Sequence, residues 1–149
     1  MRIPANRSIL RTPALLRVVL VAFAIARPAL GAAAEGESKL RALLITGQSN
    51  HRWTLTAPVL KDILEATGRF EVAVSITPPT RSGPGAWDAW RPAFQDYAVV
   101  VSEYNGEPWP EAVRAAFERY VHSGGGFVVV HAASNAFAGW PEYNRMIGV

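Results

Sequence analysis

Short apolar runs alternate with helix-like patterns along the chain from Leu40 onward. The runs at 40–46, 97–101 and 127–130 are apolar at odd and even positions alike, as in strands that helices cover on both faces of a parallel sheet. Residues 70–77 alternate between apolar and small or polar side chains, which is typical of a strand nearer the sheet edge. The pattern therefore predicts these four strands, with 127–130 central and flanked by neighbours.

Two segments show helical periodicity, and each lies between two of these strands. The first is expected to begin near Thr54 or Thr56, one of which is the predicted N-cap, and to end at Gly68. The second begins at Pro110 and ends before the glycines at 124–126, which predict a C-cap and a turn into the last strand. The predicted apolar stripes are Leu55, Val59, Leu60, Ile63 and Leu64 in the first helix, and Val113, Ala116, Phe117, Tyr120 and Val121 in the second.

The remaining connection, residues 78–92, is rich in proline and glycine and carries Trp87 and Trp90, so it is too irregular for a full helix. We interpret it as a surface loop packed by its own tryptophans, with a flap over the strand ends as the alternative. The order of elements then predicts an α/β fold, with a doubly wound, mostly parallel sheet and right-handed crossovers.

The segments that follow the predicted strands are the first place to look for function, because ligands of open α/β sheets bind beyond the carboxyl ends of the strands. Three of these segments, 48–53, 103–109 and 131–140, are polar and aromatic. Such a composition is typical of a small-molecule site. Aromatic faces beside Asn, His and Glu side chains would suit a sugar, whose C–H face stacks on a ring while its hydroxyls bind the polar groups.

Three residues are candidates for catalysis. His131 follows the strand 127–130 and is a candidate general base or metal ligand, or else a histidine that the loop backbone holds by hydrogen bonds. His51 would pair with it across the sheet edge. Glu103 is a candidate acid, base or partner of a histidine, or else an exposed loop residue. The three would make a two-histidine, one-carboxylate set, but their spacing matches no metal motif and we assign no metal. His122, at the end of a helix, is assigned a structural role.

The polar and aromatic loops also supply candidates for binding a sugar. The two asparagines would bind hydroxyl groups, although asparagine is also common in loops without any such role. The tryptophan that precedes Pro141 is either a stacking platform or a packing lid. The candidate sugar-binding residues are Trp53, Asn105, Gly106, Asn135 and Trp140.

Residues 1–34 have the order of a secretory signal peptide. Every charged residue before Glu35 is an arginine, an apolar run follows at 18–26, and small residues precede the expected cleavage site near Ala34. The apolar run is too short to span a bilayer. We therefore expect a secreted or periplasmic protein, with an uncleaved membrane anchor or a disordered tail as the alternatives.

Composition narrows the functional classes further. The 149 residues are enough for one domain with a hydrophobic core. The formal charge of +3 comes from the five arginines of the leader, because the rest of the chain has ten basic and twelve acidic residues. Nucleic-acid binding is therefore not expected, and membrane contact is expected only through an uncleaved leader. The absence of cysteine excludes disulfides, thiolate zinc sites and a cysteine nucleophile.

Three blocks together resemble the ThuA-like (trehalose-utilisation) family over essentially all of residues 40–149. The blocks are Leu-Leu-Ile-Thr-Gly47 with His51 and Trp53, then Val-Val-Val-Ser-Glu-Tyr-Asn105-Gly106, and finally Gly-Gly-Gly-Phe-Val-Val-Val-His131 with Asn135, Phe137 and Trp140-Pro-Glu-Tyr-Asn144. The resemblance implies a flavodoxin-like fold similar to class I glutamine amidotransferases, and a part in sugar utilisation by a protein that is often exported. It does not imply amidotransfer, because His131-Ala132-Ala133 stands where those enzymes have a cysteine.

The family domain continues well beyond the last of these blocks. Residues 35–149 are thus expected to be the N-terminal part of a ThuA-like domain, incomplete at the C-terminus and marginally stable alone. The function we expect is an exported domain that acts on or binds a carbohydrate or modified sugar, by proton transfer or hydrolysis if it is an enzyme. The alternatives are a non-catalytic sugar-binding or interaction module and an inactive fragment. The sequence indicates no particular cofactor.

Overall fold

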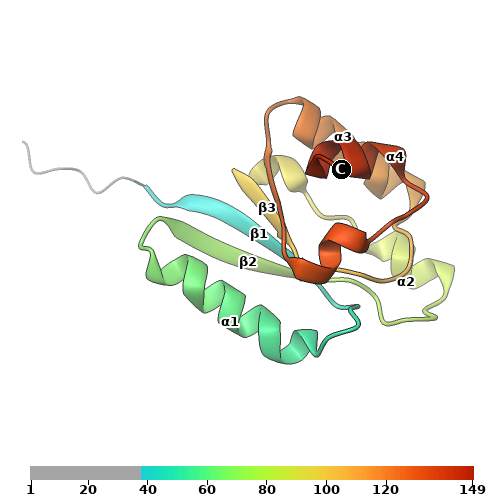
Figure 1. The fold of residues 1–149 in the computed structure, drawn as a ribbon, viewed down its shortest axis with the longest axis horizontal. Coiled ribbons are helices and arrows are strands. Elements are labelled where there is room, and N and C mark those ends of the chain that lie inside the picture. Colours follow the sequence, from blue (N-terminus) through green and yellow to red (C-terminus); the bar gives the residue numbers. More distant parts are fainter. Residues whose placement is uncertain (1–37) are drawn as a thin grey trace, which may run out of the picture. The chain divides into compact units, whose positions relative to one another are not determined.

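The computed structural model describes residues 38–149, so the predicted signal peptide lies outside the described residues. Figure 1 shows the arrangement of the elements. None of the helices in the described part is long and apolar enough to cross a membrane. The strands are β1 (Leu40–Thr46), β2 (Phe70–Ile76), β3 (Val99–Ser102) and β4 (Gly126–Val129), and the helices are α1 (Trp53–Ala66), α2 (Pro84–Ala89), α3 (Glu111–His122) and α4 (Pro141–Ile147), with short 3-10 turns at Phe94–Asp96 and His131–Asn135.

The strands form one four-stranded sheet in the order β2-β1-β3-β4, and every neighbouring pair is parallel. This confirms the predicted α/β fold and the edge position of β2. The central position predicted for the last strand is wrong, because β4 is the other edge of the sheet that residues 38–149 form. Its run of valines is apolar on both faces, yet only one face is covered, and Val128 on the bare face is 48% exposed.

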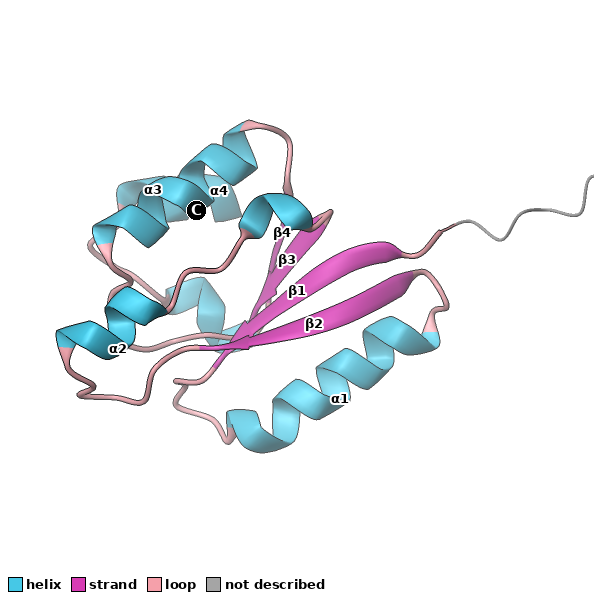
Figure 2. Cartoon of the chain, turned by 180° about the vertical axis from the view of Figure 1, so that it is seen from behind, coloured by secondary structure: helices cyan, strands magenta, loops and turns pink. Residues whose placement is uncertain are grey.

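Alternation along β1 divides the core between the two faces of the sheet. Leu43 and Ile45 belong to a large cluster with the aromatic residues of α3 and α4, whereas Ala42 and Leu44 pack with Ala57 of α1. Figure 2 shows α1 alone on its face of the sheet, while the other helices lie on the opposite face. The α1 side is therefore the thinner layer, and it leaves apolar surface beside β4.

The boundaries of α1 and α3 agree with those predicted from the sequence, except for the N-cap of α1. The cap of α1 is Arg52 without a side-chain hydrogen bond, so neither threonine serves as the predicted N-cap. Beyond its C-terminus, Gly68 has φ +72°, which is the left-handed conformation that glycine adopts without strain. Helix α3 follows Pro110 as predicted, and its predicted apolar stripe packs into the large core cluster.

The connection between β2 and β3 contains α2 and is held to the core by its own tryptophans, as interpreted from the sequence. The indoles of Trp87 and Trp90 meet edge to face at 5.9 Å, and Trp90 packs in turn on Trp109 at 5.2 Å. Trp90 is buried and its Nε1 donates a hydrogen bond to Ser75 Oγ at 3.0 Å. These contacts fix the loop against the α3 side of the sheet.

Because two tyrosines are buried, we expect the folded domain to lose stability at alkaline pH. Desolvation raises the pKa of Tyr143 and of Tyr104 above the ordinary value, while the hydroxyls donate hydrogen bonds to Ala133 O and Glu107 O. In the unfolded chain a tyrosine loses its proton near pH ~10, whereas in the folded protein it keeps the proton to higher pH. The free energy of unfolding is therefore unaffected below pH ~10 and falls above it, by about 1.4 kcal/mol per pH unit for each tyrosine. Urea unfolding measured from pH 8 to 11 checks this. The Tyr143→Phe variant should lose stability less steeply than the parent, and an identical slope would contradict the prediction.

Candidate functional site

The structure brings His51 and His131 together at the carboxyl edge of the sheet. Their ring centroids are 4.7 Å apart and the ring planes are inclined by 41°. His51 lies in the loop after β1, and His131 follows β4, although β3 separates these two strands in the sheet. The pair therefore depends on two exit loops that lean toward each other across the end of β3.

His131 is held in a strained backbone conformation. Its φ is +49°, in the left-handed region where a residue with a β-carbon costs about 1 to 2 kcal/mol. The chain here turns abruptly from β4 into the 3-10 turn, in which Ser134 Oγ donates to His131 O at 2.8 Å and Ala133 N donates to Val130 O at 3.1 Å. Strain of this kind concentrates at functional sites, because the surrounding structure must maintain it.

This strain can be measured with two substitutions at one position. Both His131→Gly and His131→Ala remove the imidazole, but only glycine adopts positive φ without strain. We expect the glycine variant to be about 1 kcal/mol more stable than the alanine variant in urea unfolding. His122, in the helical last turn of α3, is the control, where glycine should instead be the less stable substitution. An alanine variant at 131 as stable as the glycine variant would show that the turn is unstrained.

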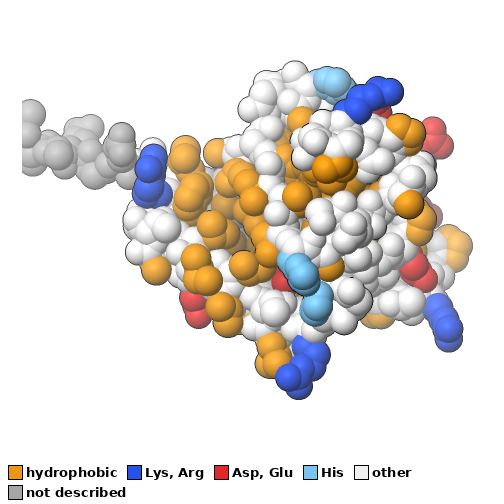
Figure 3. Space-filling view, in the orientation of Figure 1, with side chains coloured by type: hydrophobic (Ala, Val, Ile, Leu, Met, Phe, Trp, Pro, Cys, Tyr) orange, Lys and Arg blue, Asp and Glu red, His pale blue; other side chains and the backbone are white. Residues whose placement is uncertain are grey.

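Beside the two imidazoles lies an open hollow of about 570 Å³. Its polar side carries the histidines with Ser49, Arg52 and Glu103. The other side is aliphatic and consists of Leu55, Val59, Leu60 and Val130. Figure 3 shows hydrophobic side chains gathered over this part of the molecule, with two neighbouring histidines at their border. The hollow thus joins a polar, titratable end to an apolar wall.

Glu103 is buried at the back of this hollow and is only 8% exposed, so the exposed-loop alternative is wrong. Its Oε1 accepts a hydrogen bond from Thr46 Oγ1 at 2.7 Å, and its Oε2 accepts one from Thr56 Oγ1 at 2.6 Å. Each carboxylate oxygen therefore has a hydroxyl donor, one from the end of β1 and one from the first turn of α1. The side chain fixes the start of α1, and with it one wall of the hollow.

Removing this carboxylate should destabilise the domain. We expect Glu103→Ala to lower the free energy of unfolding by about 1.5 to 3 kcal/mol, since hydrogen bonds to charged groups contribute that much, and one buried and one part-buried hydroxyl contact are lost. Urea denaturation measures the change. Glu71→Ala, on the exposed side of the edge strand β2, is the matched control and should change stability little. A loss no larger than that of the control would contradict the prediction.

The five candidate sugar-binding residues lie outside the lining of the hollow. Asn105 is half-buried and its Nδ2 donates to Ala132 O at 3.0 Å. Asn135 is exposed beyond it. Gly106 packs so closely that a β-carbon would lie 2.3 Å from Gln48 Oε1. Trp53 lines a separate groove between α1 and β2.

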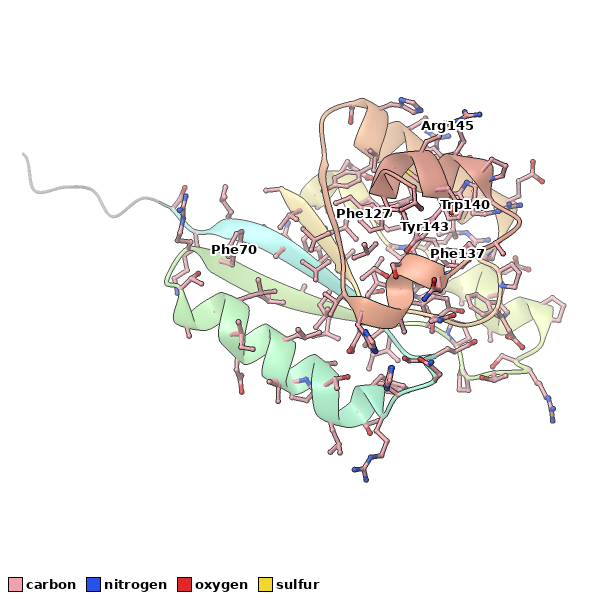
Figure 4. All side chains as sticks on the ribbon, in the orientation of Figure 1. Phe70, Phe127, Phe137, Trp140, Tyr143 and Arg145 are labelled. Carbon is pink, nitrogen blue, oxygen red and sulfur yellow. The ribbon has the colours of Figure 1, made fainter. Side chains whose placement is uncertain are left out.

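Trp140 is a packing residue, which corrects its candidacy as a stacking platform. Only 4% of it is exposed, and its Nε1 donates to Glu118 Oε1 at 2.6 Å. Figure 4 shows it near Phe137 and Tyr143, whose ring centroids lie 5.4 and 5.5 Å from its own. None of the tryptophans, all of which lie in the described part, lines the hollow. Trp90, Trp109 and Trp140 are instead buried in the large core cluster on the α3 side of the sheet.

Sequence reasoning missed the residues that the first turns of α1 bring to the site. The hollow is lined by Arg52, Leu55, Thr56 and Val59. In the sequence, Thr56 is typical of a helix start, and Leu55 and Val59 are typical of the apolar stripe of a helix. No signal in the sequence distinguished Leu55 and Val59 from the core-facing residues of the predicted stripe, and only the structure shows that both are exposed. Residues 38–149 contain no group of three or more His, Asp or Glu side chains placed to hold a metal ion.

Comparison with known proteins supplies the family. The model of the trehalose utilisation family, ThuA, matches residues 41–149. A crystal structure of a ThuA-like protein from Parabacteroides merdae has 46% sequence identity and a TM-score of 0.68, and the match covers 72% of this chain and 37% of that one. Among curated proteins, none matches the chain. The solved structure is similar in fold to the chain described above, the family model matches most of its length, and the chain belongs to the ThuA family.

Proposed function

We propose that the hollow binds a carbohydrate and that the imidazoles of His51 and His131 transfer a proton at a sugar carbon. The observation that carries this proposal is the 4.7 Å separation of the two rings. A neutral imidazole accepts a proton and a protonated one donates it, so two adjacent rings can provide a base and an acid. No hydrogen bond found among residues 38–149 uses a ring nitrogen of either histidine, which leaves these atoms free for a substrate.

The other groups of the hollow suit a sugar as well. Arg52 and Ser49 lie at the polar end and offer donors to hydroxyl groups, and the aliphatic wall accepts the C–H face of a ring. Membership of the trehalose utilisation family supports the same class of ligand. Removal of a proton from carbon requires a neighbouring carbonyl group to accept the negative charge, so the reactive form would be a carbonyl-bearing sugar. Glu103 takes a structural part in this scheme, because its buried carboxylate accepts hydroxyl hydrogen bonds from Thr46 and Thr56 and so joins β1 to α1.

The test is hydrogen exchange in deuterated water. The full-length protein is incubated with trehalose and with a panel of reducing and oxidised sugars, and ¹H NMR follows each C–H signal. Loss of one C–H signal, at a carbon next to a carbonyl group, is the result expected. Saturable binding of a sugar without exchange would instead support a non-catalytic binding module. Neither binding nor exchange of any sugar would overturn the proposal.

We also propose that the protein is exported and that its leader is removed near Ala34. The order of arginines, apolar run and small residues in 1–34 supports this. Mass spectrometry of protein from the native host gives the mature N-terminus. Cytosolic material that retains Met1 would contradict export.

A further inference from the structure

One residue of the loop after β3 contacts both histidine-bearing loops. The backbone N–H of Asn105 donates to Gln48 O at 3.0 Å, and its side-chain Nδ2 donates to Ala132 O at 3.0 Å. Gln48 lies three residues before His51, and Ala132 directly follows His131. Because β3 separates β1 from β4 in the sheet, the loop after β3 is the segment placed to join the two outer loops. Asn105 spans the gap between them.

The loop that carries Asn105 is itself held firmly. The buried side chain of Gln48 donates from Nε2 to Pro78 O at 2.8 Å and accepts at Oε1 from the Glu107 N–H at 2.9 Å. Tyr104 Oη donates to Glu107 O at 2.7 Å. Gly106 leaves no space between these groups for even a β-carbon. The amide of Asn105 therefore projects from a rigid base, and it lies outside the lining of the hollow.

We propose that Asn105 is a positioning residue that sets the distance and angle between the imidazoles of His51 and His131. This inference rests on the proposed function of the pair. The hydrogen bond to Ala132 O pins the turn immediately after His131, whose backbone is strained at φ +49°. Without that bond, the turn is free to relax toward negative φ, and this movement carries the ring of His131 away from His51. Asn105 thereby acts through the histidines and does not bind the sugar.

Asn105→Asp is the sharpest variant, because it keeps the size of the side chain and replaces the donor by an acceptor that faces a carbonyl oxygen. Asn144→Asp, in α4, is the matched control, since the Asn144 side chain makes no hydrogen bond found among residues 38–149. Asn105→Ala is the second variant, which removes the donor without adding charge if the aspartate variant fails to fold. The hollow is also lined by Arg52 and Glu103, and neither residue is changed in any of the three variants.

The first readout needs no substrate. In the parent protein, the ring protons of His51 and His131 should show a nuclear Overhauser effect, because the ring centroids are 4.7 Å apart. This effect should disappear in Asn105→Asp and Asn105→Ala and persist in Asn144→Asp. If it persists at full strength in the Asn105 variants, the inference is overturned. If the parent itself lacks it, the imidazole pair fails, and the proposed function with it.

Kinetics separate positioning from sugar binding and from general loss of structure. With an exchanging sugar, kcat should fall about 10- to 100-fold in the Asn105 variants while KM stays unchanged, because misplacing a catalytic group by about 1 Å costs up to that factor. A raised KM with unchanged kcat would make Asn105 a sugar ligand and would overturn the inference. Thermal unfolding of each variant is measured alongside, and a kcat loss that rises and falls with the unfolded fraction would also overturn it.

Discussion

Replacing His131 by alanine is expected to lower the rate of exchange at the sugar carbon by a factor of about 10² to 10⁴, the usual effect of losing a general acid or base. The imidazole is lost while the core is preserved, because His131 is exposed and sits at the rim of the sheet. The rate is measured by ¹H NMR in deuterated water under saturating sugar. Circular dichroism and urea unfolding on the same preparation confirm that the variant is folded.

The third histidine provides the matched control for this experiment. His122 lies exposed at the end of α3, outside the hollow, so His122→Ala should leave the rate unchanged. His51→Ala should resemble His131→Ala, since each ring supplies one of the two proton-transfer groups. Full activity of His131→Ala would exclude the imidazole pair as the acid and base. In that case, other groups of the protein would have to supply the acid and the base.

The second large effect is expected from Trp109→Ala, which should lower the free energy of unfolding by about 3 to 5 kcal/mol. Trp109 is only 2% exposed and occupies the centre of the aromatic core on the α3 side. Its ring lies 5.1 to 6.3 Å from six other aromatic rings, contributed by Trp90, Phe94, Tyr104, Phe117, Phe137 and Trp140. Small domains have a total stability of about 5 to 15 kcal/mol, so this single substitution would remove a large share of it.

Two further variants identify the source of this loss. Trp109 Nε1 is buried with no hydrogen-bond partner in the described part of the chain, so Trp109→Phe gives up contacts but no hydrogen bond and should cost less than Trp109→Ala. Trp87→Ala is the control at a half-buried indole on the rim of the same cluster, and it should cost less still. Chemical denaturation followed by far-UV circular dichroism gives all three values. Equal losses at Trp87 and Trp109 would contradict the central role of Trp109.

The sequence by itself determined the local elements and their class. Apolar runs with no alternation predicted β1, β3 and β4 as strands, although β4 is not an inner one. Helical periodicity predicted α1 and α3, and Gly68 and Pro110 marked an end of each helix. These signals are readable because each depends on neighbours within one or two turns of the chain. The sequence also directed attention to the correct edge of the sheet, since parallel strands deliver their exit loops to the same side.

Only the tertiary structure decided which side chains of those loops meet. His51 and His131 face each other, yet Trp140 turns inward to the aromatic core, and Glu103 turns inward to two threonine hydroxyls. The edge position of β4 in the sheet that residues 38–149 form is likewise given only by the strand order. Whether a loop side chain points to a ligand or to the core depends on burial and hydrogen bonds with segments distant in sequence. Those interactions join residues that are far apart in the sequence, so no local pattern of residues encodes them.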